Sequence, residues 1–139
     1  MLRTGYLLGL VSLVLLGTSI GCRAKSDLET YPISGTVTYQ GKPVPIGSIT
    51  LIPDSNQGNR GAAVSLEIID GKFDSASASR GHIGGPHVAT IIGLDGKGDD
   101  DLFPKGYMLF QDYQMTLDLP KEPSTKDIVV PTDQKKPRR

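Results

Sequence analysis

The sequence predicts an all-β fold, a single β-sandwich of about seven strands, from three observations. Apolar and polar residues alternate with a period of two in several short segments, as they do in strands with one buried face. Turn-forming segments separate these strands, and the 139 residues include 17 glycines and 10 prolines. From residue 22 onward, no window of eleven or more residues has an apolar stripe with the 3.6-residue period of a helix.

The first half of the predicted domain contains three strands. Residues 33–40 alternate Ile, Gly, Val and Tyr with Ser, Thr, Thr and Gln, and residues 41–45 are dense in turn formers. A second strand is predicted at 48–52 and ends at the Pro-Asp pair that follows. After a polar loop, residues 62–69 alternate again. One face of that third strand carries Val64, Leu66 and Ile68.

The second half begins with a tight turn at Asp70-Gly71, a dipeptide typical of β-hairpins. The remaining predicted strands are 72–74, 87–94, 113–119 and 127–130. The small, polar residues of 75–85 predict a loop, or a weak edge strand without an identifiable partner. Short strands at this spacing, joined by Gly- and Pro-containing turns, favour a sandwich.

Residues 1–21 have the features of a secretory signal peptide. Arg3 supplies a short positive region, Tyr6–Leu16 are apolar, and small residues follow. The alternative is an N-terminal transmembrane anchor. The uncharged run from Gly5 to Gly21 is 17 residues long, which is short for a helix that needs about 20 apolar residues to span a bilayer. We therefore favour a cleaved signal.

Cys22, the only cysteine, lies directly after this segment. The sequence Ser19-Ile20-Gly21-Cys22 resembles the bacterial lipobox, in which a small residue precedes a cysteine that is lipidated and becomes the mature N-terminus. Ser19 departs from that pattern, which usually has Leu, Val or Ile there. The alternative is ordinary cleavage that leaves a free thiol, an unusual feature in an oxidising compartment. We expect lipidation at Cys22 and attachment to a membrane without spanning it.

The remaining chain divides into three predicted parts. Residues 22–30 are a polar tether, 31–131 the β-sandwich, and 132–139 a basic tail that we expect to be disordered. Lys and Arg together number 15, as do Asp and Glu. This balance argues against a nucleic-acid-binding protein, which normally has a basic excess.

A family resemblance lies in the run from Tyr31 to Pro53. It resembles the opening of transthyretin-like, carboxypeptidase-regulatory-like domains. The matching positions are Gly35, Val37, Tyr39, Gly41, Pro43, Val44, Ile49 and Pro53, and Leu51 stands where Phe is common. Segments 71–73, 85–87 and 118–120 are similar to parts of small lipoproteins of planctomycete-type bacteria.

The resemblance implies a prealbumin-like sandwich of about seven strands and a mostly non-catalytic accessory module. The residues agree with that fold. Gly41 and Pro43 are suited to a hairpin between two strands that bury Val37 and Ile49. Gly35 would let another backbone approach closely.

Metal ligands are sparse. His82 and His87 could bind zinc with a nearby carboxylate, but their spacing matches no short zinc motif, and we expect both to be solvent-exposed. The weak cation candidates are Asp95, Asp99, Asp100 and Asp101. Their loop suits a hard cation but fails the EF-hand pattern, because Lys97 occupies a ligand position and no bidentate Glu follows. We predict a surface loop and no cofactor.

Catalytic motifs are also lacking, since no G-x-S-x-G or phosphate-binding loop occurs. The segment around Phe103, Tyr107, Phe110 and Tyr113 could expose an apolar patch for a partner or glycan, or could close one end of the sandwich. The resulting prediction is a non-enzymatic cell-envelope lipoprotein. A lipid at Cys22 would hold it on a bacterial membrane, with the domain facing the periplasm or exterior and serving structural or protein contacts. The alternative is a carbohydrate- or calcium-binding module.

Overall fold

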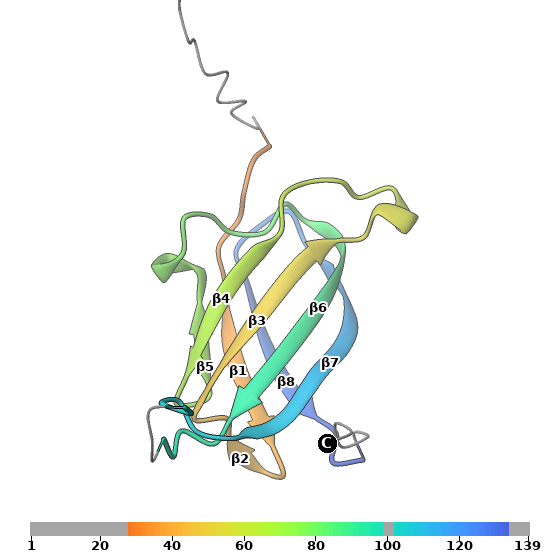
Figure 1. Cartoon of the computed structure of the whole chain (residues 1–139). Coiled ribbons are helices and arrows are strands. Elements are labelled where there is room, and N and C mark those ends of the chain that lie inside the picture. Colours follow the sequence, from red (N-terminus) through yellow and green to blue (C-terminus); the bar gives the residue numbers. More distant parts are fainter. Residues whose placement is uncertain (1–27, 99–101, 134–139) are drawn as a thin grey trace, which may run out of the picture.

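The computed structural model describes residues 28–98 and 102–133, and in these residues the chain is all β (Figure 1). The strands are β1 (Ile33–Tyr39), β2 (Lys42–Pro43), β3 (Ile46–Pro53), β4 (Val64–Ile69), β5 (Lys72–Asp74), β6 (Gly85–Leu94), β7 (Met108–Leu119) and β8 (Ser124–Val130). Two 3-10 turns, η1 (Ser55–Gln57) and η2 (Ser75–Ser77), complete the described elements. None of the described helices has the length and apolar composition needed to cross a membrane.

The strands form one curled, mainly antiparallel sheet in the order β2-β1-β5-β4-β3-β6-β7, with β8 paired to β1. Figure 1 shows the curl, which places β1 and β8 behind β3 and β6. The concave side therefore encloses the apolar core. The all-β prediction is confirmed at this level.

The parallel pair of β1 and β8 closes the back of the sheet. Its register runs from Ile33↔Ser124 to Tyr39↔Val130, and the Thr36 hydroxyl donates to Asp127 Oδ1 at 2.7 Å. A Cβ on Gly35 would collide with the carbonyl oxygen of Lys126. Glycine is therefore required at this close contact, as expected from the sequence.

Two tight turns set the connections on the lower edge of Figure 1. Asp70 and Gly71 both have positive φ, 48° and 76°, and they join β4 to β5 as the Asp-Gly pair predicts. The hairpin expected around Gly41 is shorter than predicted. It joins β1 only to the two-residue β2, and β3 then pairs with β4 and β6 instead of β1.

The core is built from alternate residues of facing strands. Val64, Leu66 and Ile68 of β4 are all buried, which confirms the predicted inner face of that strand. The other buried apolar residues are Ile33, Val37, Val44, Ile49, Leu51, Phe73, Ala89, Ile91, Phe110, Leu119, Ile128 and Val130. Burying this many apolar side chains in one cluster is the main stabilising contribution.

Strand β7 is longer than the sequence predicts because a β-bulge interrupts its alternation. It begins at Met108 rather than Tyr113. Ile91 of β6 pairs with Tyr113 of β7, and Gly93 pairs with Phe110. Between these pairs β7 advances by three residues while β6 advances by two, so β7 has one extra residue. Asp112 has a φ of 53° at this point. One extra residue reverses which side chains face inward, so a period-two pattern cannot extend across it.

The loop between β5 and β6 is confirmed as irregular. It opens with η2, and the Ser75 hydroxyl accepts a hydrogen bond from the Ile33 amide at 2.9 Å. The signal segment, Cys22, Asp99, Asp100, Asp101 and residues 134–139 of the predicted tail lie outside the described residues.

Candidate functional site

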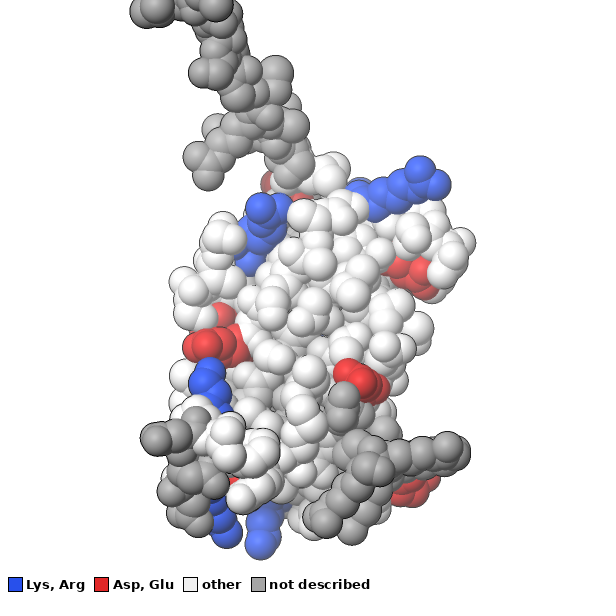
Figure 2. Space-filling view, viewed as in Figure 1, with Lys and Arg blue, Asp and Glu red and all other residues white. Residues whose placement is uncertain are grey.

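The outer face of β3, β4 and β6 carries hydroxyl and aliphatic side chains. Period-two alternation points these residues away from the core. They are Ile46, Ser48, Thr50, Ile52, Ser65, Ile69, Val88, Thr90, Ile92 and Leu94, and Glu67 of β4 adds a carboxylate toward one side of this face. Figure 2 shows an area without charged residues over the middle of β3 and β6. The hydroxyls of Thr50 and Ser65 lie 3.2 Å apart, across the pair of strands. This face is a continuous surface without a charge at its centre.

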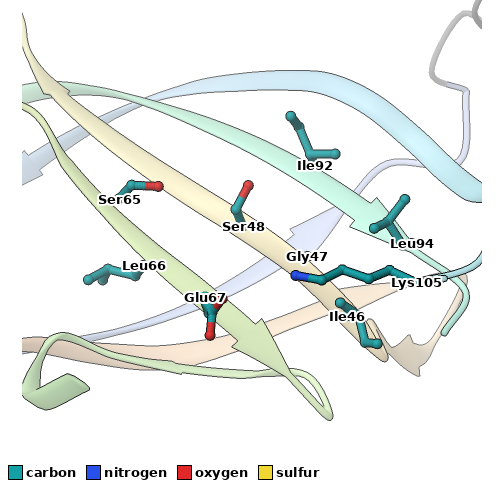
Figure 3. A pocket seen from close by; sticks show the side chains of 9 residues that line it. All are labelled: Ile46, Gly47, Ser48, Ser65, Leu66, Glu67, Ile92, Leu94 and Lys105. Atoms are coloured by element: carbon teal, nitrogen blue, oxygen red, sulfur yellow. The ribbon is translucent and has the colours of Figure 1, made fainter. Parts of the chain in front are cut away.

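A shallow groove of about 270 Å³ lies at the lower part of this face (Figure 3). It is lined by Ile46, Gly47, Ser48, Ser65, Leu66, Glu67, Ile92, Leu94 and Lys105. Gly47 pairs with Gly93, and a Cβ on Gly47 would collide with the carbonyl oxygen of Ile92. The two glycines therefore let β3 and β6 pass each other closely at the groove floor.

The groove has one cation and one anion. Figure 3 shows the Lys105 side chain extending over Ile46 and Gly47 toward β4, the strand that carries Glu67. The two side chains do not form an ion pair with each other. Hydroxyls and aliphatic carbons fill the space around them. This combination suits an uncharged polar or zwitterionic segment, which could use both charges and the hydroxyls.

Lys105 belongs to the loop 95–107, and Asp95 organises that loop. Asp95 Oδ1 accepts the amides of Lys97 at 3.0 Å and Tyr107 at 2.9 Å, and the Asp95 amide donates to the Tyr107 carbonyl at 2.9 Å. The hydrogen bond from the Lys97 amide, followed by that from the Tyr107 amide, lowers the pKa of Asp95. This carboxylate therefore has a structural role in the loop.

The described residues contain no group of three His, Cys, Asp or Glu side chains placed to hold a metal ion. Of the four predicted cation candidates, Asp95 alone is described, and its carboxylate already binds the backbone of its loop. The other three, Asp99, Asp100 and Asp101, lie outside the described residues. A calcium site in this loop therefore stays a prediction.

The aromatic segment divides into an exposed part and a core part. Phe103 and Tyr107 lie against each other with ring centroids 5.1 Å apart and are 48% and 53% exposed. Phe110 instead is buried against Tyr39, at 5.0 Å. The segment therefore contributes residues both to the surface and to the core, and a partner or glycan for its exposed part stays a prediction. The exposed apolar tip consists of Leu102, Phe103, Tyr107 and Met108.

The apolar tip is continuous with the groove, because Lys105 lies between Phe103 and Tyr107 in the sequence and lines the groove. Figure 1 shows residues 102–107 at the lower end of the sheet, whereas the described segment 28–32 before β1 lies at the upper end. The combined surface is thus at the opposite end of the domain from its N-terminal segment. The sequence indicated the tip through its aromatic residues, but the groove residues had no recognisable signal.

The two histidines are not exposed, which corrects the sequence prediction. His82 and His87 are each 1% exposed, and their rings lie edge to face with centroids 6.2 Å apart. They come together because Tyr31 pairs with His82 beside the start of β6, where His87 lies. Five-residue spacing across a loop gave no indication of this burial. Neither histidine lines the groove, so no histidine is positioned there to activate Ser48 or Ser65.

In comparisons with protein-family models, curated proteins and solved structures, the chain has no significant match.

Proposed function

We propose that this chain is a cell-envelope lipoprotein, anchored to a membrane by a lipid on Cys22, whose β-domain is a non-catalytic module for protein contacts. The apolar region Tyr6–Leu16, followed by small residues and then Cys22, supports the anchor. A prealbumin-like sandwich is the proposed fold, consistent with two strand groups, β4-β3-β6-β7 and β5-β1-β8, on opposite sides of one core.

The observation that carries the contact role is that the apolar tip and the point where the chain enters the domain lie at opposite ends. The N-terminal segment lies at one end of the sheet, and the apolar tip with its adjoining groove lies at the other (Figure 1). If the chain is tethered through residues 22–30, this surface projects away from the bilayer. Large apolar side chains exposed together are a feature of interaction sites.

Metabolic labelling with a palmitate analogue tests the anchor. We expect label on the wild-type chain and none on Cys22→Ser, with the label and the chain both in the membrane fraction. An unlabelled wild type, or equal labelling of the variant, would contradict lipidation at Cys22.

Site-specific photo-crosslinking in intact cells tests the contact surface. A photoreactive phenylalanine at position 107 lies in the apolar tip, and the same residue at position 79 occupies an exposed position in the segment 78–84, which Figure 1 shows near the other end of the sheet. We expect discrete protein adducts from position 107 and none of the same size from position 79. Identical adducts from both positions, or none from either, would count against a contact role for the tip.

Glycan binding is a second candidate, favoured by the Phe103–Tyr107 pair. Two exposed aromatic rings at 5.1 Å offer an apolar surface for a sugar ring, beside the hydroxyls of the groove. Titration with envelope glycan fragments distinguishes this activity, because binding would quench Tyr107 fluorescence and would be lost in Tyr107→Ala. Quenching that persists in this variant would exclude the apolar tip as the glycan site.

A further inference from the structure

His82 joins three segments at the end of the sheet where residue 28 lies. The Tyr31 amide donates to the His82 carbonyl at 2.7 Å, and the His82 amide donates to the Tyr31 carbonyl at 3.0 Å. Its ring lies 5.8 Å from the Tyr31 ring, and its Nε2 lies 3.2 Å from the Ser124 hydroxyl. The Ser124 amide in turn donates to the Pro32 carbonyl at 3.0 Å. His82 therefore connects Tyr31, the loop before β6 and the start of β8, through its backbone on one side and its buried imidazole on the other.

The hydrogen bonds fix the protonation state of His82. The Gly84 amide donates to Nδ1 at 3.0 Å, so this nitrogen must carry a lone pair. The proton then resides on Nε2, which faces the Ser124 hydroxyl and the carbonyls of Pro32 and Glu122. The described geometry is that of a neutral imidazole.

The neighbouring His87 has the complementary arrangement. Its Nδ1 lies 2.9 Å from the carbonyl oxygen of Gly85, which can only accept, so Nδ1 carries the proton. The two rings therefore stand side by side, buried, with opposite tautomers. A positive charge on either ring would face the other at a centroid distance of 6.2 Å.

No carboxylate in the described residues hydrogen-bonds to the His82 ring to offset a charge. From the N-terminal segment it faces Tyr31, whose hydroxyl is bonded to Glu29. From the turn before β8 it meets the Glu122 carbonyl, and Lys121 lies against Gly84. His87 faces the His82 ring from β6. Arg80 lies two residues before His82 in the loop that precedes β6.

Adding a proton at Nδ1 of His82 would turn this nitrogen into a donor that faces the Gly84 N–H. Neither donor would then have an acceptor. It would also bury a charge, which is costly unless the charge is paired. Burial first, and the nearby His87 second, lower the pKa of His82. All three effects favour opening of the structure around a protonated ring.

We propose that His82 is an acid-sensitive clamp, whose protonation releases residues 28–32 and the start of β8 while the rest of the sheet stays folded. The remaining β1 contacts, including those to β5, do not depend on the imidazole. Release of five residues adds up to about 17 Å of reach to the chain that precedes β1. In a protein anchored through Cys22, a consequence that rests on the proposed function, the domain would then extend farther from the bilayer in acid.

Hydrogen exchange of the full-length chain in detergent tests the clamp at about pH 7.5 and about pH 5.5, with intrinsic rates corrected. We expect the amides of Tyr31, His82 and Ser124 to lose protection by about tenfold or more at the lower pH. Amides in the centres of β3 and β6 should keep theirs. Equal protection of the three amides at both pH values, or loss of protection throughout the sheet, would overturn the proposal.

Two variants give the matched control. His82→Asn places a carboxamide oxygen where Nδ1 accepts from Gly84 and does not titrate in this range, so protection should not depend on pH. His87→Asn removes the neighbour that, after burial, lowers the pKa of His82 in the closed state, so acid should open the structure less, or only at a lower pH, than in the wild type. Opening of His82→Asn at the same pH as the wild type would contradict the proposal. If His82→Asn does not fold, nitrogen-15 spectra of the wild-type imidazoles decide the question, because His82 must titrate together with amide opening.

Discussion

The imidazole rings of His82 and His87 meet at an interplanar angle of 87°, fully buried beside the N-terminal segment of the domain. Burial lowers the pKa of His82, whose ring has no bonded carboxylate among the described residues, so this imidazole favours the neutral form. The folding stability of this chain should therefore depend on pH in the range where histidine titrates.

Stability should fall as the pH decreases below about 6.5, the pKa of an unfolded histidine. The pKa of His82 is lowered in the folded state, by burial and then by His87, so the unfolded chain binds more protons in this window. The stability that neutral His82 gives the folded state is fully present above about pH 6.5. It is lost as the pH falls from there toward the lower pKa that His82 has in the folded state. Urea denaturation at about pH 7.5, 6.5 and 5.5 measures it.

His82→Asn serves as the control, because it should flatten this dependence between about pH 6.5 and 5.5. Asp54 and Asp95 do not interfere, since their pKa values are lowered from an already acidic reference of 3.8. A wild-type midpoint that stays constant across the window would show that His82 is protonated without cost in the fold.

Asp95→Ala should loosen the loop that carries the apolar tip, whereas Asp95→Asn should not. The asparagine oxygen can still accept the amides of Lys97 and Tyr107, and alanine cannot. Hydrogen exchange at these two amides is the measurement, with faster exchange expected only in the alanine variant. Faster exchange in both variants would mean that the negative charge, and not the acceptor, holds the loop.

The aromatic segment provides a comparison between core and surface. Phe110→Ala should reduce the free energy of unfolding by about 3–5 kcal/mol, because it removes a buried ring that packs on Tyr39. Phe103→Ala should cost about 1 kcal/mol or less, since Phe103 is 48% exposed. Chemical denaturation of both variants tests the division, and equal losses would contradict it.

Local alternation was sufficient to predict most strands. In β4, Val64, Leu66 and Ile68 face the core as their spacing indicates. The start of β7 could not be predicted in this way, because the bulge at Asp112 places Phe110 and Tyr113 on the same side three residues apart. A pattern with a period of two ends at such a point even though the strand continues.

Long-range pairing was beyond local patterns. Nothing in the residues of β8 indicates that it lies parallel to β1, 91 residues away at the Thr36–Asp127 contact. The burial of His82 and His87 also depends on a long-range contact, because Tyr31 pairs with His82 in the loop before β6. The groove likewise arises where Lys105 meets strands that are distant in sequence.

Gly35→Val should destabilise the domain by about 2–4 kcal/mol, because any side chain at this position collides with the Lys126 carbonyl and the Phe73 ring. The carbonyl belongs to the β1–β8 ladder and cannot move without breaking that pairing. Gly58→Ala is the control: a Cβ there meets nothing within 4 Å, and its φ of 78° costs about 1–2 kcal/mol at most. Urea denaturation separates the two substitutions, and amide exchange in β8 should increase only for Gly35→Val. If Gly35→Val were no more destabilising than Gly58→Ala, the close approach of β8 to β1 would be wrong.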